Sequence, residues 1–212
     1  MNEFKKLGLS DTTIEALEKK GFKKPSAIQE KVIPILLAGE HDVIGQAQTG
    51  TGKTACFALP ILEDLEKVPY VQAIILAPTR ELAVQVAKEI DSLKGSRKVK
   101  VAAIYGGASI RDQMDELRRG VDIVVGTPGR VMDLMDRNKL DISNVTYAVL
   151  DEADEMLNMG FVEDIEEILK QTNPDKKMLL FSATMPREIL KIAKKFMKNH
   201  ELVTVEGDAL AT

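Results

Sequence analysis

The stretch that decides the fold of this chain is Ala47-Gln48-Thr49-Gly50-Thr51-Gly52-Lys53-Thr54, which joins an apolar run to a helical pattern. Gly50 and Gly52 allow the backbone to curl, so that its N–H groups point inward at phosphate oxygens. The positive N-terminal end of the following helix attracts the same oxygens. We expect Lys53 to reach the β- and γ-phosphates of a nucleotide, and Thr54 to offer its hydroxyl to Mg²⁺. The stretch therefore predicts a phosphate-binding loop.

One position departs from the strict pattern of such loops, because Ala47 stands where the general motif has glycine. The simplest alternative is a glycine-rich turn between a strand and a helix that binds no ligand. The strand, the loop, the Lys-Thr pair and the helix all agree, and they favour the phosphate site. We expect the nucleotide to contact seven residues, namely Gln48, Thr49, Gly50, Thr51, Gly52, Lys53 and Thr54.

Short apolar runs alternate with helical patterns along the chain. The strand candidates are Asp42–Ala47, Ala73–Pro78, Val99–Tyr105, Asp122–Gly126, Tyr147–Leu150, Met178–Ser182 and Leu202–Val205. They are apolar at nearly every position, as strands buried on both faces are. Stretches with helical spacing lie among them, including Arg80–Leu93, Ile110–Arg119, Val162–Lys170 and Arg187–Met197. The alternation predicts an α/β fold with a mainly parallel sheet of about seven strands and helices on both faces.

Polar or glycine-rich segments follow six of these strands. In parallel α/β sheets, ligands bind beyond the carboxyl ends of the strands. Six such segments at that edge favour a functional face over chance. They are Gln48–Thr54, Thr79-Arg80-Glu81, Gly106-Gly107, Thr127-Pro128-Gly129-Arg130, Asp151–Asp154 and Ala183-Thr184.

The acidic segment Asp151-Glu152-Ala153-Asp154 directly follows an apolar strand. Enzymes with a phosphate loop place their magnesium carboxylate at this position, so we expect Asp151 to hold Mg²⁺ largely through water. Glu152 could orient or deprotonate the attacking water. The alternative is the charged first turn of a helix, where acids are favoured for electrostatic reasons. The neighbouring phosphate loop favours the metal site.

Length and composition limit the number of domains and the classes of function that the chain can have. The 212 residues suffice for one large α/β domain, and the net charge of -4 argues against nucleic-acid binding by bulk positive charge. Backbone N–H groups can still bind phosphates. Cys56 is the only cysteine, which excludes an internal disulfide, and we expect it to be a small buried residue. No apolar run approaches the roughly 20 residues of a membrane span. We expect a cytoplasmic monomer.

At this point the sequence resembles a known family. Asp151–Asp154 spells the signature of the DEAD-box RNA helicases of superfamily 2, and the whole chain resembles their first RecA-like lobe. The phosphate loop is similar to their motif I, which has alanine at its first position. Further matches are Pro78–Ala83 to motif Ia, Gly106-Gly107 to the glycine pair, Thr127–Arg130 to motif Ib, Ser182-Ala183-Thr184 to motif III, and residues 21–29 with Phe4 upstream to the Q-motif.

The resemblance implies an ATP-dependent enzyme with Mg²⁺ as cofactor, in which Glu152, Lys53 and Asp151 are catalytic. It implies that Gln29 reads the adenine edge, that Phe22 stacks on the adenine ring, and that Lys24 belongs to the same site. The residues alone favour another interpretation, in which Phe22 is a core aromatic and Gln29 is a solvent-facing helix residue.

The resemblance also implies an RNA track without base recognition, since backbone N–H groups and short polar side chains bind phosphates and 2′-hydroxyls. Its residues would be Pro78, Thr79, Arg80, Gly106, Gly107, Thr127, Pro128, Gly129 and Arg130. Structural ion pairs of Arg80 and Arg130 are the alternative. Asp154, Ser182 and Thr184 would couple the RNA and nucleotide sites, through a hydrogen bond from Ser182 to Asp154. A helix N-cap before Pro186 is the simpler reading of Ser182 and Thr184.

We expect three parts: a helical Q-motif extension (1–40, with helices at Ser10–Lys20 and Ser26–Leu37), a RecA-like ATP-binding lobe (41–206) and a tail (207–212). The family has a second RecA-like lobe whose motif VI supplies arginine fingers, and no such motif follows within these residues. We therefore expect an isolated first lobe, with a natural single-lobe protein as the alternative. Arginine fingers contribute roughly 10³–10⁵ in rate, so the lobe alone should bind nucleotide, hydrolyse it very slowly and unwind nothing.

Two other functions remain open from the sequence. One is a non-enzymatic RNA or protein adaptor that has kept the fold. An adaptor would have no reason to keep the four residues of a working site, namely Lys53, Thr54, Asp151 and Glu152. The other is a phosphate-loop ATPase that acts on protein or DNA. The Q-motif and the Asp-Glu-Ala-Asp segment favour RNA.

Overall fold

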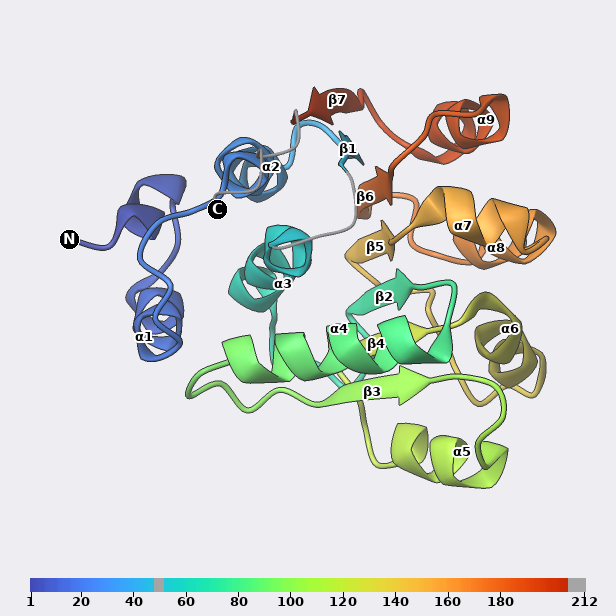
Figure 1. Cartoon of the computed structure of the whole chain (residues 1–212). Coiled ribbons are helices and arrows are strands. Elements are labelled where there is room, and N and C mark those ends of the chain that lie inside the picture. Colours follow the sequence, from blue (N-terminus) through green and yellow to red (C-terminus); the bar gives the residue numbers. More distant parts are fainter. Residues whose placement is uncertain (48–51, 206–212) are drawn as a thin grey trace.

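The sheet has seven strands, and every adjacent pair runs parallel. In the computed structural model, which describes residues 1–47 and 52–205, the strand order is β3-β4-β2-β5-β6-β1-β7 (Figure 1). The strands are β1 (Val43–Gln46), β2 (Ala73–Leu76), β3 (Val101–Ile104), β4 (Ile123–Gly126), β5 (Tyr147–Leu150), β6 (Lys177–Ser182) and β7 (Glu201–Thr204). Each strand predicted from the sequence is present, which confirms the predicted α/β fold with a parallel sheet.

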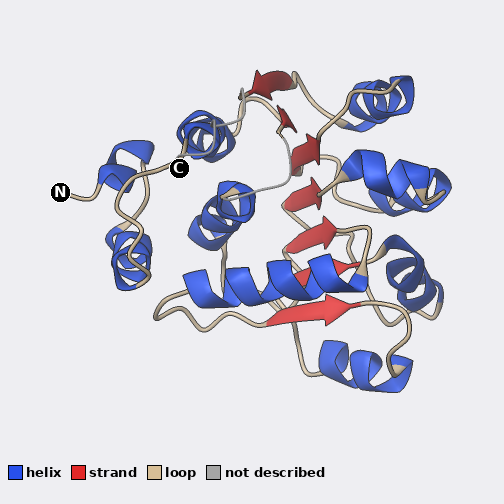
Figure 2. Cartoon of the chain, in the orientation of Figure 1, coloured by secondary structure: helices blue, strands red, loops and turns tan. Residues whose placement is uncertain are grey.

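Helices cover both faces of the sheet (Figure 2). One face carries η1 (Glu3–Leu7), α1 (Asp11–Lys19), α2 (Ala27–Ala38), α3 (Lys53–Asp64) and α4 (Arg80–Leu93). The other carries α5 (Ile110–Arg118), α6 (Pro128–Asp136), α7 (Ala153–Asn158), α8 (Val162–Lys170) and α9 (Arg187–Phe196). No helix in residues 1–47 and 52–205 is both long and apolar enough to cross a membrane.

The alternation of side chains along a strand explains why the strands are apolar throughout. In β2, Ala73 and Ile75 point into the core beneath α3 and α4, and Ile74 and Leu76 point into the core on the other face. All four are at most 1% exposed. Because both faces are covered, a polar side chain at any of these positions would lose its hydration.

The N-terminal segment packs onto the lobe. Val32, Ile33 and Leu36 of α2 are fully buried in the same core as α3. Farther out, the Glu63 carboxylate at the end of α3 accepts hydrogen bonds from the backbone and hydroxyl of Ser10 at 2.9 and 2.8 Å. The boundary at residue 40 stays a prediction, and the predicted tail 207–212 lies outside the described residues.

Strand order divides the functional edge of the sheet into two halves. The adjacent strands β5, β6 and β1 lead into the acidic segment, Ser182–Thr184 and the phosphate loop. The adjacent strands β3, β4 and β2 lead into Gly106-Gly107, Thr127–Arg130 and Thr79-Arg80. The strands that lead toward the predicted phosphate and metal residues therefore form one half of the sheet, and those that lead toward the predicted RNA residues form the other. The two halves meet where β2 lies beside β5.

Candidate active site

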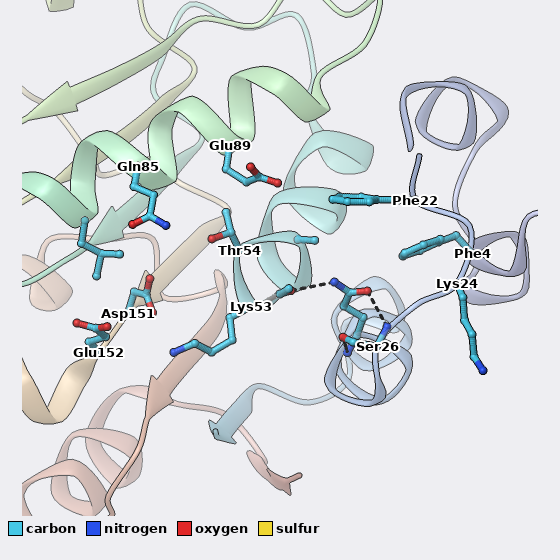
Figure 3. A pocket seen from close by; sticks show the side chains of 14 residues that line it. Phe4, Phe22, Lys24, Ser26, Lys53, Thr54, Gln85, Glu89, Asp151 and Glu152 are labelled. Atoms are coloured by element: carbon cyan, nitrogen blue, oxygen red, sulfur yellow. Dashed lines mark hydrogen bonds between the residues drawn. The ribbon is translucent and has the colours of Figure 1, made fainter. Parts of the chain in front are cut away.

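A cavity of about 680 Å³ opens at the nucleotide half of this edge (Figure 3). It lies between the segment before α2, the first turn of α3, one face of α4 and the end of β5. Its lining residues are Phe4, Phe22, Lys24, Ser26, Gln29, Gly52, Lys53, Thr54, Ala55, Leu82, Gln85, Glu89, Asp151 and Glu152. Residues that the sequence assigned to phosphate, adenine and metal thus surround one space.

The start of α3 requires glycine at position 52. Gly52 is the N-cap, with φ of 93° in the left-handed region. A Cβ there would lie 2.6 Å from the Gln29 amide nitrogen, so a larger residue would be strained and would also collide. Lys53 and Thr54 form the first turn of α3, where backbone N–H groups have no helical partner and can bind an anion. The predicted contacts of residues 48–51 lie outside the described residues.

Gln29 is buried, with 6% of its surface exposed. Its side-chain oxygen accepts a hydrogen bond from the Ser26 backbone N–H at 2.9 Å, and its amide nitrogen donates to the Gly52 carbonyl oxygen at 3.0 Å. The interpretation of Gln29 as a solvent-facing helix residue is therefore wrong. An amide has two N–H donors and two acceptor lone pairs, so one of each remains for a ligand.

Phe22 is also not a core residue. Its ring is 37% exposed and lines the cavity beside Phe4, which is 2% exposed. Lys24 lines the same cavity. A partly exposed aromatic ring that lines a cavity can stack on a flat ring.

Asp151 carries a buried charge with incomplete hydrogen bonding. It is 4% exposed, and among the described residues its Oδ1 atom has no hydrogen-bond partner. Burial raises the pKa of Asp151 to about 6, although the Lys53 ammonium opposes the shift. Leaving such an oxygen unpaired is costly. The arrangement fits a carboxylate that gains partners only when a ligand binds.

Glu152 has a backbone conformation that is rare for its residue type. Its φ of 48° and ψ of 53° are left-handed, and it stands at the N-cap of α7. Such a conformation costs on the order of 1 kcal/mol and is enriched at functional sites. The side chain lines the nucleotide cavity and a second, adjoining cavity.

The second cavity, of about 250 Å³, bridges the two halves of the edge. Pro78 and Thr79 after β2 line it, together with Asp154 after β5 and Ser182 after β6. Asp154 Oδ2 accepts hydrogen bonds from the Thr184 backbone N–H at 3.1 Å and from its hydroxyl at 2.9 Å.

The Ser182 hydroxyl donates to the Thr184 carbonyl oxygen at 2.7 Å, and Ser182 also helps to lower the pKa of Asp154. The predicted hydrogen bond from Ser182 to Asp154 therefore stays a prediction, and Thr184 is a further donor to Asp154. The alternative role as a helix cap is wrong, since Pro186 is the N-cap of α9.

On the other half of the edge, neither arginine forms an ion pair within the described part of the chain, so that alternative is wrong. The Arg80 guanidinium lies 4.8 Å from the centre of the Tyr105 ring. Arg130 donates to the Ala108 carbonyl at 3.2 Å and to the Gln113 side-chain oxygen at 2.9 Å.

The remaining candidates on this half differ in exposure. Gly106, Gly107 and Gly129 are exposed, whereas Pro128 is buried in the first turn of α6. Thr127 is the N-cap of α6, and Pro128 is the first residue of that helix. Proline is favoured in the first turn of a helix because its missing N–H costs nothing there.

Sequence reasoning missed several residues. Gln113 on α5 is 6% exposed and joins the Tyr105 carbonyl, at 3.0 Å, to Arg130. On α4, Leu82, Gln85 and Glu89 line the nucleotide cavity. Their spacing places them on one helix face, but that spacing alone does not distinguish a site from ordinary packing.

Known proteins resemble this chain over nearly its whole length. The sequence pattern of the DEAD/DEAH box helicase family matches residues 26–192. A probable ATP-dependent RNA helicase of Methanocaldococcus jannaschii is 53% identical over 206 residues, which are 97% of this chain and 56% of that protein. The ATP-dependent RNA helicase CshA of Limosilactobacillus reuteri is 50% identical over 211 residues, 99% of this chain and 42% of that protein.

Solved structures agree. The crystal structure of a DEAD box protein from Methanococcus jannaschii has a TM-score of 0.92 and 53% identity, over 96% of this chain and 56% of that one. The crystal structure of a hypothetical ATP-dependent RNA helicase from Sulfolobus tokodaii has a TM-score of 0.85 and 40% sequence identity. The match covers 93% of this chain and 57% of that one.

The parallel sheet and these structural relatives define a RecA-like α/β protein. The chain belongs to the DEAD/DEAH box helicase family, and it corresponds to the N-terminal RecA-like lobe. It spans about half the length of the curated relatives it matches.

Proposed function

We propose that this chain is the ATP-binding lobe of an RNA helicase, which hydrolyses ATP in response to RNA when it acts with a second lobe. One observation carries the proposal. The buried Asp151 carboxylate has an oxygen without a hydrogen-bond partner among the described residues, and it shares a cavity with Lys53 at the start of a helix and with the amide of Gln29. The cavity thus offers groups for metal, phosphate and base at once.

Asp151 and Thr54 are the residues that would hold Mg²⁺. The ion usually keeps several waters and uses one or two carboxylates together with nucleotide phosphates, so a large cluster of acidic ligands is not needed. The Oδ1 atom of Asp151, which has no hydrogen-bond partner within residues 1–47 and 52–205, would accept a hydrogen bond from a metal-bound water. When bound, the ion neutralises phosphate charge.

Lys53 would bind the β- and γ-phosphates, assisted by the first N–H groups of α3. The Lys53 ammonium lowers the pKa of Asp151, although burial has the larger, opposite effect. The positive charge of Lys53 therefore interacts with the carboxylate in the same cavity. Glu152 would orient or accept a proton from the attacking water. Its backbone conformation aims it differently from Asp151.

Gln29 and Phe22 would select adenine. Adenine presents one acceptor and one donor on adjacent atoms of its edge, which match the donor and acceptor that Gln29 has left. Guanine presents a different pattern. Phe22 would stack on the base, and Lys24 lies at the same mouth.

The RNA backbone would lie along the other half of the edge. Exposed glycine backbone at 106, 107 and 129 can approach phosphates closely, and Arg80 and Arg130 add charge. Asp154 lines the bridging cavity and accepts hydrogen bonds from Thr184, and this contact would couple the two sites. Pro128 is buried, so the contact with RNA proposed for this segment would come from exposed neighbours such as Gly129.

Without arginine fingers from a second lobe, we expect nucleotide binding with very weak hydrolysis and no unwinding, since those fingers supply roughly 10³–10⁵ in rate. The cytoplasmic location and the monomeric state stay predictions.

Binding of ADP measured by calorimetry tests the proposal. Lys53→Ala should weaken binding in the presence of Mg²⁺ by about 10- to 100-fold, as expected for the loss of a hydrogen-bonded charge. Lys170→Ala, which removes an exposed lysine of α8 on the opposite face, is the matched control. Asp151→Asn should abolish the dependence of ADP affinity on Mg²⁺. Unchanged binding by Lys53→Ala would exclude the phosphate site.

Two further functions are tested separately. An adaptor without catalysis would show no ATP hydrolysis after a second lobe is joined. An ATPase that acts on DNA would be stimulated by DNA as strongly as by RNA. The proposal expects hydrolysis that RNA stimulates and DNA does not.

A further inference from the structure

An ion pair stands beside the ring that lines the mouth of the nucleotide cavity. The Lys20 ammonium, at the C-terminal end of α1, donates to Glu89 Oε1 at 3.1 Å and to Ser92 Oγ at 2.5 Å. The same nitrogen lies 5.3 Å from the centre of the Phe22 ring. A cation at this distance from an aromatic face is attracted by the ring. Two residues of α4 therefore fix a charge over Phe22.

The backbone of Phe22 is held independently of its side chain. Its N–H donates to the Leu17 carbonyl at 2.9 Å, and its carbonyl oxygen accepts from the Asn2 side-chain amide at 2.8 Å. Leu17 and Asn2 are buried, and Gly21, with φ of 78°, lies in the turn between Leu17 and Phe22. The chain is thus fixed, and the orientation of the ring depends on what touches it.

The two faces of the ring have different surroundings. Lys20 stands over one face and is not among the described residues that line the cavity, whereas Phe22 and Glu89 are. Figure 3 shows the ring nearly edge-on, with one face turned toward the side of the cavity where Ser26 lies. Because Lys20 stands over one face of the ring, a flat ligand in the cavity would stack on the other face.

We infer that Lys20, held by Glu89 and Ser92, is a positioning residue for the recognition of the nucleotide base. It holds the Phe22 ring in the orientation in which a purine stacks on its open face. The inference rests on the proposed function, because it requires that Phe22 stacks on the base. Lys20 itself touches neither base nor phosphate.

Through Glu89, the Lys20 side chain also contacts helix α4. Glu89 lies on the face of α4 that lines the cavity, and α4 begins at Arg80 on the other half of the edge. An exposed ion pair by itself adds little to stability, so its value here is geometric. Lys20 is well suited to that task, because its side chain is only 24% exposed and has two fixed partners.

The test is a double-mutant cycle on the whole chain, with dissociation constants for ADP and for inorganic tripolyphosphate, which has no base. Lys20→Met keeps the length of the side chain and removes its charge, and it should weaken ADP binding about two- to fivefold, the range for a cation over a partly exposed ring. Tripolyphosphate binding should not change. Lys20→Arg should restore ADP binding, and Glu89→Gln should reproduce part of the loss. Lys19→Met, at a lysine whose side chain is 75% exposed, is the control and should match the wild type.

In the cycle, Lys20→Met should have no further effect once Phe22→Leu is present, since the ring it positions is gone. Thermal unfolding of each variant verifies the fold. Equal losses for ADP and tripolyphosphate would show a general charge effect and would overturn the inference. If Phe22→Leu weakens ADP binding and Lys20→Met does not, the inference fails and the proposed function stands. If Phe22→Leu has no effect, base stacking and the inference fail together.

Discussion

The side-chain amide of Gln29 donates a hydrogen bond to the Gly52 carbonyl oxygen, 3.0 Å away, and so joins helix α2 to the turn that starts α3. The contact is close, because a Cβ at position 52 would lie 2.6 Å from the same amide nitrogen. The residue proposed to read the base is thereby attached to the turn proposed to hold the phosphates. A movement of the Gly52 turn would therefore displace the Gln29 side chain, and the reverse.

Replacing Gln29 by alanine should remove the preference for adenine. The affinity for ADP should fall about tenfold, and the affinity for GDP should change much less, since the lost hydrogen bonds are specific to the adenine edge. Calorimetry with both nucleotides measures the ratio. Gln171→Ala, which removes an exposed amide on α8's C-terminal side, is the control. An unchanged ADP-to-GDP ratio in Gln29→Ala would exclude Gln29 from the base site.

Gly45→Ala should destabilise the fold by about 1–3 kcal/mol, the usual cost of overpacking. Gly45 on β1 pairs with Phe181 on β6, and a Cβ at position 45 would lie 2.4 Å from the Phe181 ring. Urea unfolding measures the change. Gly106→Ala is the matched control, because nothing lies within 4 Å of its added Cβ. Equal stability of the two variants would contradict the packing argument. The Lys53 ammonium lies 5.6 Å from the same ring, so Gly45→Ala should also weaken ADP binding.

Thr184→Val should lower stability in a way that depends on pH. Burial raises the pKa of Asp154, but the hydrogen bonds from Thr184, together with those from Glu155 and Ser182, outweigh burial, and the pKa lies below its usual value. A carboxyl whose pKa is lower in the folded chain stabilises the fold above its unfolded pKa of about 3.9, and this stabilisation is lost as the pH falls through the folded pKa. The variant should therefore lose about 1 kcal/mol at neutral pH and progressively less below about pH 4.

Urea unfolding over that pH range measures the effect of Thr184→Val. Thr204→Val, at an exposed threonine of β7, is the control and should show no such trend. A loss for Thr184→Val that is the same at neutral and acid pH would show that the bond to the ionised Asp154 is not its cause.

Cys56 should react with thiol reagents only when the fold opens. It is fully buried one turn after Gly52, and burial raises the pKa of its thiol, so the reactive thiolate is scarce. We expect labelling in the native state to be about a hundredfold or more slower than in denaturant, and slower still with ADP and Mg²⁺. Absorbance at the release of the reagent follows one site, because the chain has one cysteine. Labelling of the native protein at the denatured rate would contradict the buried position.

The sequence by itself determined the elements of the fold and the chemistry of its edge. Strands buried on both faces must be apolar throughout, so runs such as 73–78 and 147–150 were recognisable. The phosphate loop and the acidic segment are local patterns, in which spacing along the chain sets the geometry. Parallel strands place their carboxyl ends at one edge, so the site followed from the order of elements.

Only the tertiary structure decided which side chains touch. Lys20 and Phe22 are near in sequence, but Glu89 and Ser92 of α4 hold the Lys20 ammonium over the Phe22 ring. The turn after β6 brings the Thr184 hydroxyl within 2.9 Å of Asp154, which lies 30 positions earlier in the chain. Gln113 showed no motif, yet it holds Arg130. Such contacts join residues far apart in the chain, and their geometry depends on how helices pack on the sheet, which no local pattern encodes.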